Sequence, residues 1–290
     1  MTKRGTKNIG ASVRARLLQI AHAEKRDYLV VLQRFALERL LHRLTLSTHA
    51  DRFTLKGAML FVVWAGSPHR ATRDLDLLSR GEPEVEGLAS VWREVAAIDL
   101  DDGVKFEGTS VTASVIREGR EYEGVRVLLI AKIENARIDL QIDVGFGDAV
   151  VPRPKKVTLP VLLDFPAPEL RAYVPETVVA EKFHAMVEHG IVNTRLKDYY
   201  DIWWLMQRRM LDEQKLCDAI AATFSRRKTS IPTSTPPALS AGYATDPIKA
   251  KQWLAFCRRA GVSDAPELAT VVSIIEPALM GASATVRGGG

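Results

Sequence analysis

Residues 72–78 read Thr-Arg-Asp-Leu-Asp-Leu-Leu, and this alternation of acidic and apolar residues predicts a β-strand. Side chains two residues apart in a strand lie on the same face. Asp74 and Asp76 therefore share one face, while Leu75 and Leu77 share the other. Because the leucines mark a buried face, the strand brings two carboxylates together at the boundary of a core.

Two adjacent carboxylates on a buried strand repel each other unless a cation neutralises them. Mg²⁺ suits this role because it prefers hard oxygen ligands and keeps positions open for phosphate oxygens. The opposing interpretation is an exposed strand edge or turn, which is the usual setting of a lone Asp-x-Asp. Lys56, Arg70 and Arg73 could neutralise the pair structurally, but they are also suited to gripping a triphosphate. Gly57 would let backbone N–H groups come close to phosphates.

A third carboxylate is expected from the β-rich run over residues 137–146. Asp139 and Asp143 in this run face the same side, so alternation cannot choose between them. For Asp139 the ordinary alternative is a strand-edge charge paired with Arg137. Two acids from one strand and one from its neighbour could hold two Mg²⁺ ions about 4 Å apart, which would activate an attacking hydroxyl and stabilise a pyrophosphate leaving group.

The order of patterns along the chain predicts an α+β fold followed by a helical lobe. Residues 12–46 have the spacing of two amphipathic helices, and 103–146 hold several strands. A proline-rich connection follows at 151–168, and no strands are expected after it. Helices are expected to begin near Pro175, Leu196, Asp212 and Pro247, with a last one capped by Ser263 or Asp264 and a frayed end over 281–290. The predicted lobes are residues 1–165 and 166–290.

The 290 residues are 47% hydrophobic and 26% charged, which fits a globular chain with a sizeable core. No apolar segment follows a basic start, and no apolar run approaches the roughly 20 residues that a bilayer requires. Cys217 and Cys257 lie far apart without a metal-ligand spacing, which argues against a zinc site or a disulfide framework. We expect a cytoplasmic protein without a membrane segment.

The N-terminal 43 residues are strongly basic, with ten Lys or Arg residues against three acids and a net charge of +7. A basic face concentrates polyanions such as RNA through counterion release, although many basic helices are only solvated surface. The basic residues are Lys3, Arg4, Lys7, Arg14, Arg16, Lys25, Arg26, Arg34, Arg39 and Arg43.

Five motifs occur in a fixed order along the chain. They are Leu55-Lys56-Gly57-Ala58, Arg70-x-Thr72-Arg73-Asp74-Leu75-Asp76-Leu77, Leu140-Gln141-Ile142-Asp143-Val144-Gly145-Phe146-Gly147-Asp148, Glu176-Thr177 with Ala180-Glu181-Lys182, and Arg195-x-Lys197-Asp198-x-x-Asp201-Ile202. Together they resemble the AbiEii/AbiGii-type nucleotidyltransferase toxins, which include the MenT toxins, over roughly residues 35–260. The resemblance implies a DNA-polymerase-β-like core with a mixed sheet, a helical C-terminal lobe, and a toxin counteracted by a cognate antitoxin.

The resemblance also implies roles for individual residues. Gly57 matches the motif that contacts nucleotide phosphates, Asp74 and Asp76 match the metal-binding pair, and Asp143 is favoured as the third metal ligand. Lys182 matches a phosphate-contacting lysine and Asp198 a catalytic acid. Together with the residues suited to grip a triphosphate, these matches give a predicted nucleotide-binding set of Lys56, Gly57, Arg70, Thr72, Arg73, Lys182 and Arg195. Ala58 departs from the family, which usually has a small polar or glycine residue there.

Ordinary explanations exist for the helical residues of this set. Lys182 could be a boundary lysine whose stem covers apolar neighbours. Asp201 is spaced for a structural i,i+4 pair with Lys197, which leaves Asp198 as the functional candidate.

The sequence therefore predicts an NTP-dependent nucleotidyltransferase toxin that uses Mg²⁺ and transfers a nucleoside monophosphate to RNA, such as tRNA, or to a protein. A nucleotidyltransferase for a small molecule such as an antibiotic shares the metal site but has no need of a basic face. A catalytically silent module that binds nucleic acid or a partner is the alternative outside enzymes.

Overall fold

The structure, a computed structural model, describes residues 8–66, 74–118 and 122–288. Its contacts divide the chain into two compact units, which we describe separately. The first comprises residues 1–147 and 156–172, and the second comprises 148–155 and 173–290. The first unit holds the sheet and the second is helical, so the predicted α+β fold class is confirmed. The predicted lobe boundary after residue 165 stays a prediction.

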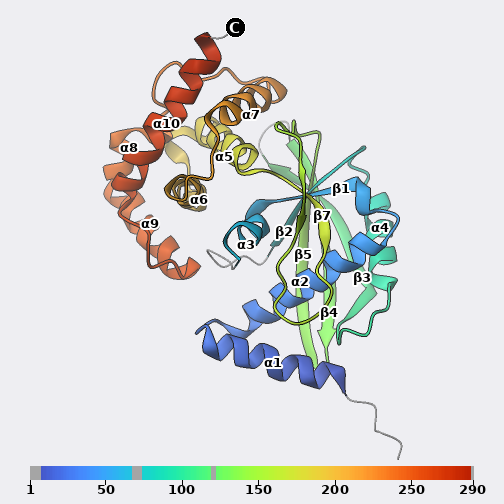
Figure 1. The fold of residues 1–290 in the computed structure, drawn as a ribbon. Coiled ribbons are helices and arrows are strands. Elements are labelled where there is room, and N and C mark those ends of the chain that lie inside the picture. The colour runs from blue at the N-terminus through green and yellow to red at the C-terminus, as the bar shows by residue number, and fades with distance from the viewer. Residues whose placement is uncertain (1–7, 67–73, 119–121, 289–290) are drawn as a thin grey trace, which may run out of the picture. The chain divides into compact units, whose positions relative to one another are not determined.

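The described part of the first unit is built on a seven-stranded mixed sheet, ordered β3-β4-β5-β2-β1-β7-β6. Most of its strands are labelled in Figure 1. The central strand β2 runs parallel to β5 and antiparallel to β1. The β4 strand is antiparallel to both of its neighbours. The strands are β1 (Phe53–Lys56), β2 (Asp74–Ser79), β3 (Lys105–Glu118), β4 (Tyr122–Ile133), β5 (Ala136–Phe146), β6 (Lys155–Thr158) and β7 (Glu169–Ala172).

One face of the central strands is the core of this unit. Leu75 and Leu77 of β2 and Ile142 and Val144 of β5 are 0% exposed. The helices of the unit are α1 (Ile9–Ala23), α2 (Tyr28–Leu46), α3 (Leu60–Ala65) and α4 (Val85–Ala97), and the predicted pair within 12–46 is confirmed as α1 and α2. Of these, α2 packs on β5 and α4 packs on β3. Because strands alternate, the opposite face of β2 and β5 carries their polar residues.

The expectation of no strands after the proline-rich connection is wrong. The β6 strand lies within that stretch and β7 directly follows it, and β7 pairs with β1 through Leu55 and Ala172. Each is four residues long, too short for a clear alternation signal. Pairing with a distant strand, rather than local propensity, determines such elements.

The second unit is helical, and its first four long helices begin where the sequence predicts. They are α5 (Pro175–His189), α6 (Leu196–Gln207), α7 (Glu213–Arg226) and α9 (Pro247–Ala260), with the short α8 (Ala241–Thr245) and the long α10 (Leu268–Gly288). Asp212 and Asp246 cap α7 and α9 through their side chains.

The predicted limits of the last helix are wrong at both ends. The helix begins at Leu268, so Asp264 lies before it and does not cap it. The Asp264 side chain instead accepts a hydrogen bond from the Tyr200 hydroxyl at 2.9 Å, and Pro266 O accepts one from Trp253 Nε1 at 2.9 Å. At the other end the helix continues to Gly288, because Ala282 and Ser283 are buried.

The α10 helix also corrects the expectation that no apolar run is long enough for a bilayer. Its length and composition alone would allow it to cross a membrane, with a mean hydropathy of 1.4. Val271, Ile275 and Leu279 are buried within the helical unit, and 33% of the most apolar window of the helix is buried. Glu276 also accepts a hydrogen bond from Thr235 at 2.6 Å.

Candidate active site

Four charged residues from four adjacent strands lie in one row across the sheet. Lys56 of β1 is in register with Asp76 of β2, Asp76 with Asp143 of β5, and Asp143 with Arg126 of β4. Register partners project to the same face, about 5 Å apart. The row therefore reads plus, minus, minus, plus, with two carboxylates between two cations.

Asp74 extends this arrangement along β2. It is in register with Gln141 of β5 and is exposed, while Asp76 is half-buried and Leu75 between them is buried. The predicted alternation of β2 is therefore confirmed: Asp74 and Asp76 share the polar face of a strand whose other face is in the core.

Gly57 follows β1 directly and lies very close to Asp76. Its φ of +72° is in the left-handed region, which favours glycine. A Cβ at position 57 would lie 2.5 Å from Asp76 Cγ and 2.6 Å from Asp76 Cβ, closer than real carbon atoms approach. Backbone conformation and space both require glycine here, and the backbone of the turn after β1 consequently lies against the carboxylate of Asp76.

Asp143 and Asp139, which alternation cannot distinguish, differ clearly in their surroundings. Asp139 is exposed and forms an ion pair with Arg137 at 3.2 Å, the ordinary explanation considered for it. Asp143 is in register with Asp76 and accepts two hydrogen bonds from Arg126, both at 2.8 Å. Position on the sheet therefore favours Asp143 as the carboxylate nearest the Asp74 and Asp76 pair.

Arg126 is a site residue that sequence analysis did not identify. It lies in a strand whose neighbour could not be known in advance, and its only sequence signal is an arginine among apolar residues of β4. It adds a cation to the end of the row that carries Asp143.

Asp74 and Asp76 fit a divalent cation, because they present hard carboxylate oxygens on one face of a strand. Asp143 fits by position, but its carboxylate is held by Arg126. Within the described ranges no three His, Cys, Asp or Glu residues are arranged to hold a metal ion. The metal role of Asp143 stays a prediction.

The remaining residues predicted to grip the nucleotide are only partly described. Lys56 is half-buried and stands beside Asp76 in the row. Arg70, Thr72 and Arg73 lie outside the described residues, so their predicted roles stay predictions. Ala58, where the resemblance implies a small polar or glycine residue, is 7% exposed, so its methyl group packs in the core.

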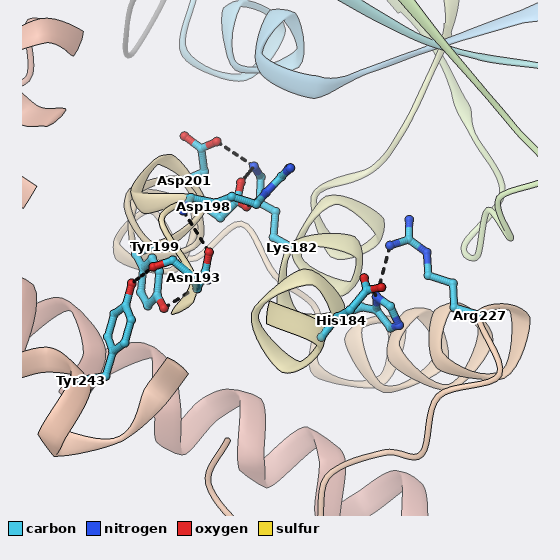
Figure 2. Close-up of polar contacts among 10 residues, drawn as sticks. Lys182, His184, Asn193, Asp198, Tyr199, Asp201, Arg227 and Tyr243 are labelled. Atoms are coloured by element: carbon cyan, nitrogen blue, oxygen red, sulfur yellow. Dashed lines mark hydrogen bonds and ion pairs between the residues drawn. The ribbon is translucent and has the colours of Figure 1, made fainter. Parts of the chain in front are cut away.

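The helical unit contains a second charged cluster, formed by α5 and the start of α6 (Figure 2). Lys182 Nζ lies 2.6 Å from Asp198 Oδ1 and 2.9 Å from Asp201 Oδ2. Arg195 Nε donates to the second oxygen of Asp198 at 2.8 Å. Both aspartates are 0% exposed and Lys182 is 12% exposed, so the cluster is a buried ionic network. Three predicted site residues, Lys182, Asp198 and Arg195, are therefore in direct contact with one another.

The charge state of Asp198 bears on its predicted role. Burial acts to raise the pKa of its carboxyl, but Lys182 and then Arg195 outweigh this, and the pKa is held below its ordinary value. A carboxylate with a low pKa is a poor proton acceptor. This favours Asp198 as a residue that orients its neighbours over Asp198 as a base.

Asp201 has a larger part in this cluster than its spacing suggested. Its spacing predicts a structural i,i+4 pair with Lys197, whereas the structure buries Asp201 and pairs it with Lys182. Since Asp198 and Asp201 lie three residues apart on α6, one lysine from α5 reaches both.

Another polar network of the helical unit surrounds His184 of α5. Its Nε2 lies 2.9 Å from Thr229 Oγ1, and its Nδ1 lies 3.2 Å from Arg227 Nη1. Arg227 also donates to Asp148 at 3.2 Å. Burial, and then the charge of Arg227, lower the pKa of His184 to about 4, so the imidazole is neutral near pH 7.

The predicted basic face of residues 1–43 is wrong for three of its members. Arg39 and Arg43 lie on the buried side of α2 and are 0% and 1% exposed. Arg43 donates two hydrogen bonds to the Asp102 carboxylate, at 2.6 and 3.0 Å. Arg34 forms an ion pair with the buried Glu38 at 2.8 Å. Within the described residues the face is reduced to Arg14, Arg16, Lys25 and Arg26, and Arg26 itself forms an ion pair with Glu24 at 3.0 Å.

Comparison with known proteins identifies the family. The family model described as "Nucleotidyl transferase AbiEii toxin, Type IV TA system" matches residues 39–273. No curated protein matches the chain.

Two solved structures from Helicobacter pylori share the fold. The protein JHP933 aligns with a TM-score of 0.53 at 12% identity, covering 89% of this chain and 94% of that chain. A second one, provisionally described as a nucleotidyltransferase, aligns with a TM-score of 0.52 at 12% identity, covering 89% and 96%. At this identity the likeness shows the fold alone. The family match spans well over half of the sequence, and the chain therefore belongs to the AbiEii family of nucleotidyltransferase toxins of type IV toxin–antitoxin systems.

Proposed function

We propose that the enzyme transfers a nucleoside monophosphate from an NTP to an RNA acceptor such as tRNA, with Mg²⁺ held by Asp74 and Asp76 and by Asp143 as a third ligand. The observation that supports this most strongly is the row of Lys56, Asp76, Asp143 and Arg126 on the polar face of the sheet. Membership of a type IV toxin family implies a cognate antitoxin and an NTP substrate.

In the proposed reaction an acceptor hydroxyl oxygen forms a bond to the α-phosphorus of the NTP. The bond from that phosphorus to pyrophosphate breaks, and the hydroxyl proton passes to solvent. When bound, Mg²⁺ would neutralise the charge of the reacting phosphates. Lys56 stands beside Asp76 as a cation for the triphosphate. Without a side chain, Gly57 would let backbone N–H groups come close to phosphates beside the carboxylate of Asp76.

Lys182 is the proposed phosphate-contacting residue of the helical unit. Asp198 and Asp201 fix its ammonium group, so its position is set before substrate binds. A preorganised cation stabilises developing charge without reorganising during the reaction. In this account Asp198 and Asp201 hold Lys182, and Arg195 completes the charge balance around Asp198.

The proposal of an RNA acceptor depends on the basic residues that remain exposed or half-buried on the N-terminal helices. Replacing Arg14, Arg16, Lys25 and Arg26 with Gln should raise the KM for RNA and leave the KM for NTP nearly unchanged. Added salt should have the same effect, because counterion release drives binding to polyanions. An acceptor KM that responds neither to the substitutions nor to salt would refute this role of the four residues.

A small-molecule acceptor is the second candidate, favoured by the burial of Arg39 and Arg43, which weakens the basic face. Incubation of the enzyme with each α-labelled NTP, Mg²⁺, total RNA and a panel of antibiotics separates the two. Label in RNA supports the first proposal, and label in an antibiotic supports the second. We propose that the protein is cytoplasmic, where it would meet either an RNA or an antibiotic acceptor.

A further inference from the structure

The carboxylate of Asp143 accepts three hydrogen bonds from neighbouring side chains, although its proposed role is to bind a metal ion. Arg126 Nε donates to its Oδ1 at 2.8 Å, Arg126 Nη2 donates to Oδ2 at 2.8 Å, and Gln141 Nε2 donates to Oδ2 at 3.1 Å. A bidentate arginine–carboxylate pair is strong and directional. The Asp143 side chain is 16% exposed, so solvent screens the pair only in part.

The register of the sheet brings Arg126 and Asp143 together, because both residues lie in regular strands. Arg126 and Asp143 are direct partners on the antiparallel strands β4 and β5, and Asp143 and Asp76 are direct partners on β5 and β2. Asp143 therefore stands between a guanidinium on one side and a carboxylate on the other. It is drawn toward Arg126 and repelled by Asp76.

We propose that Arg126 is a positioning residue that holds Asp143 away from the Asp74 and Asp76 pair and competes with a divalent cation for that carboxylate. This inference rests on the proposed function, in which Asp143 is the third metal ligand.

The competition follows from charge and from hydrogen-bonding capacity. A carboxylate offers about four lone-pair positions, and donors already use three of those on Asp143. A divalent cation between Asp76 and Asp143 would also repel the guanidinium of Arg126. Linkage then requires that Arg126 lowers the affinity for the cation and that the cation weakens the hold of Arg126.

The test measures the affinity of the full chain for Mn²⁺ without NTP. Electron paramagnetic resonance detects the Mn²⁺ that stays free in solution. Arg126→Gln should bind Mn²⁺ about fivefold more tightly than wild type, since a partly exposed pair contributes about that factor. The gain should vanish in the double variant Arg126→Gln/Asp143→Asn. Arg126→Lys keeps the charge without the bidentate geometry and should show a smaller gain. Arg137→Gln, which removes the exposed cation paired with Asp139, is the matched control and should bind as wild type.

Asp76→Asn separates this inference from the proposed function. Weaker Mn²⁺ binding by Asp76→Asn with no gain in Arg126→Gln and Arg126→Lys would overturn the competition and leave the metal site standing. Mn²⁺ binding by Asp76→Asn at wild-type affinity would overturn the metal site itself. A gain that persists in the double variant Arg126→Gln/Asp143→Asn would also overturn the competition.

Discussion

Gly57 lies so close to the side chain of Asp76 that no residue with a Cβ fits at position 57 without a shift. The backbone of Gly57, at φ +72°, lies so close that a Cβ would stand 2.5 Å from Asp76 Cγ. The turn after β1 and the carboxylate pair of β2 are therefore one structural unit. The glycine motif and the acidic motif, which lie well apart in sequence, depend on each other physically.

Gly57→Ala should therefore damage both stability and transfer. We expect a loss of about 1–3 kcal/mol in the free energy of unfolding, from backbone strain and the clash with Asp76, and at least a tenfold loss of kcat/KM. Gly66→Ala is the matched control, since Gly66 has the same φ of +72° and, among the described residues beyond its chain neighbours, no heavy atom lies within 4 Å of the added Cβ. Denaturant unfolding and transfer assays on both variants measure the difference. Equal effects would mean that the contact with Asp76 does not matter.

Asp143→Asn should be far more damaging to transfer than Asp139→Asn. Asp143 is in register with Asp76 and bonded to Arg126, whereas Asp139 is exposed and paired with Arg137. Asp139→Asn should change stability by less than about 0.5 kcal/mol and leave transfer nearly normal. The comparison needs only initial rates at matched Mg²⁺. The opposite ranking would make Asp139 the third acid, closer to the N-terminal end of β5.

Lys182→Ala should raise the KM for NTP because it removes the ammonium group. Asp201→Asn and Asp198→Asn should also raise it, because each disturbs the position of that group. Lys182→Ala should also lower the free energy of unfolding by about 3–5 kcal/mol, since it leaves two buried carboxylates facing each other. Steady-state kinetics with NTP varied gives the answer. A fall in kcat with an unchanged KM in Asp198→Asn alone would instead indicate a direct part in the chemistry.

His184 should make the stability of the protein depend on pH between about 6.5 and about 4. Its pKa is lowered from 6.5 to about 4 by burial and by Arg227, so the unfolded chain takes up a proton that the folded protein does not. The stabilisation is complete above pH 6.5 and is lost as the pH falls toward 4. His184→Gln should flatten the slope of unfolding free energy against pH over this interval. His22→Gln, at an exposed position on α1, should leave the slope unchanged.

The strongest local patterns predicted the structure well. The alternation in β2 placed Asp74 and Asp76 on one face, and proline and aspartate at helix starts located α5, α7 and α9. These features depend on residues that are close in sequence. The ordered motifs then supplied the family, which the family match confirms.

Features that depend on distant partners could not be predicted. Arg126 gains its place in the row only through the register of β4 with β5. Arg43 looked like surface charge because its partner, Asp102, is 59 residues away. A local clue existed, since Phe35, Arg39 and Arg43 follow one another at spacings of four on a helix and so share one face. The Lys182 cluster likewise joins two helices whose packing the sequence does not encode locally.

The central claim is that the Asp74 and Asp76 face of β2 transfers nucleotides, and Asp76→Asn tests it most directly. Wild type and Asp76→Asn are incubated with each α-labelled NTP, Mg²⁺ and total RNA, and label in RNA is counted. Asparagine keeps the size of the side chain and removes one charge, so the fold should persist, as circular dichroism can verify. We predict labelled RNA with wild type and a loss of more than about a hundredfold in the variant. Transfer by Asp76→Asn at the wild-type rate would contradict the account.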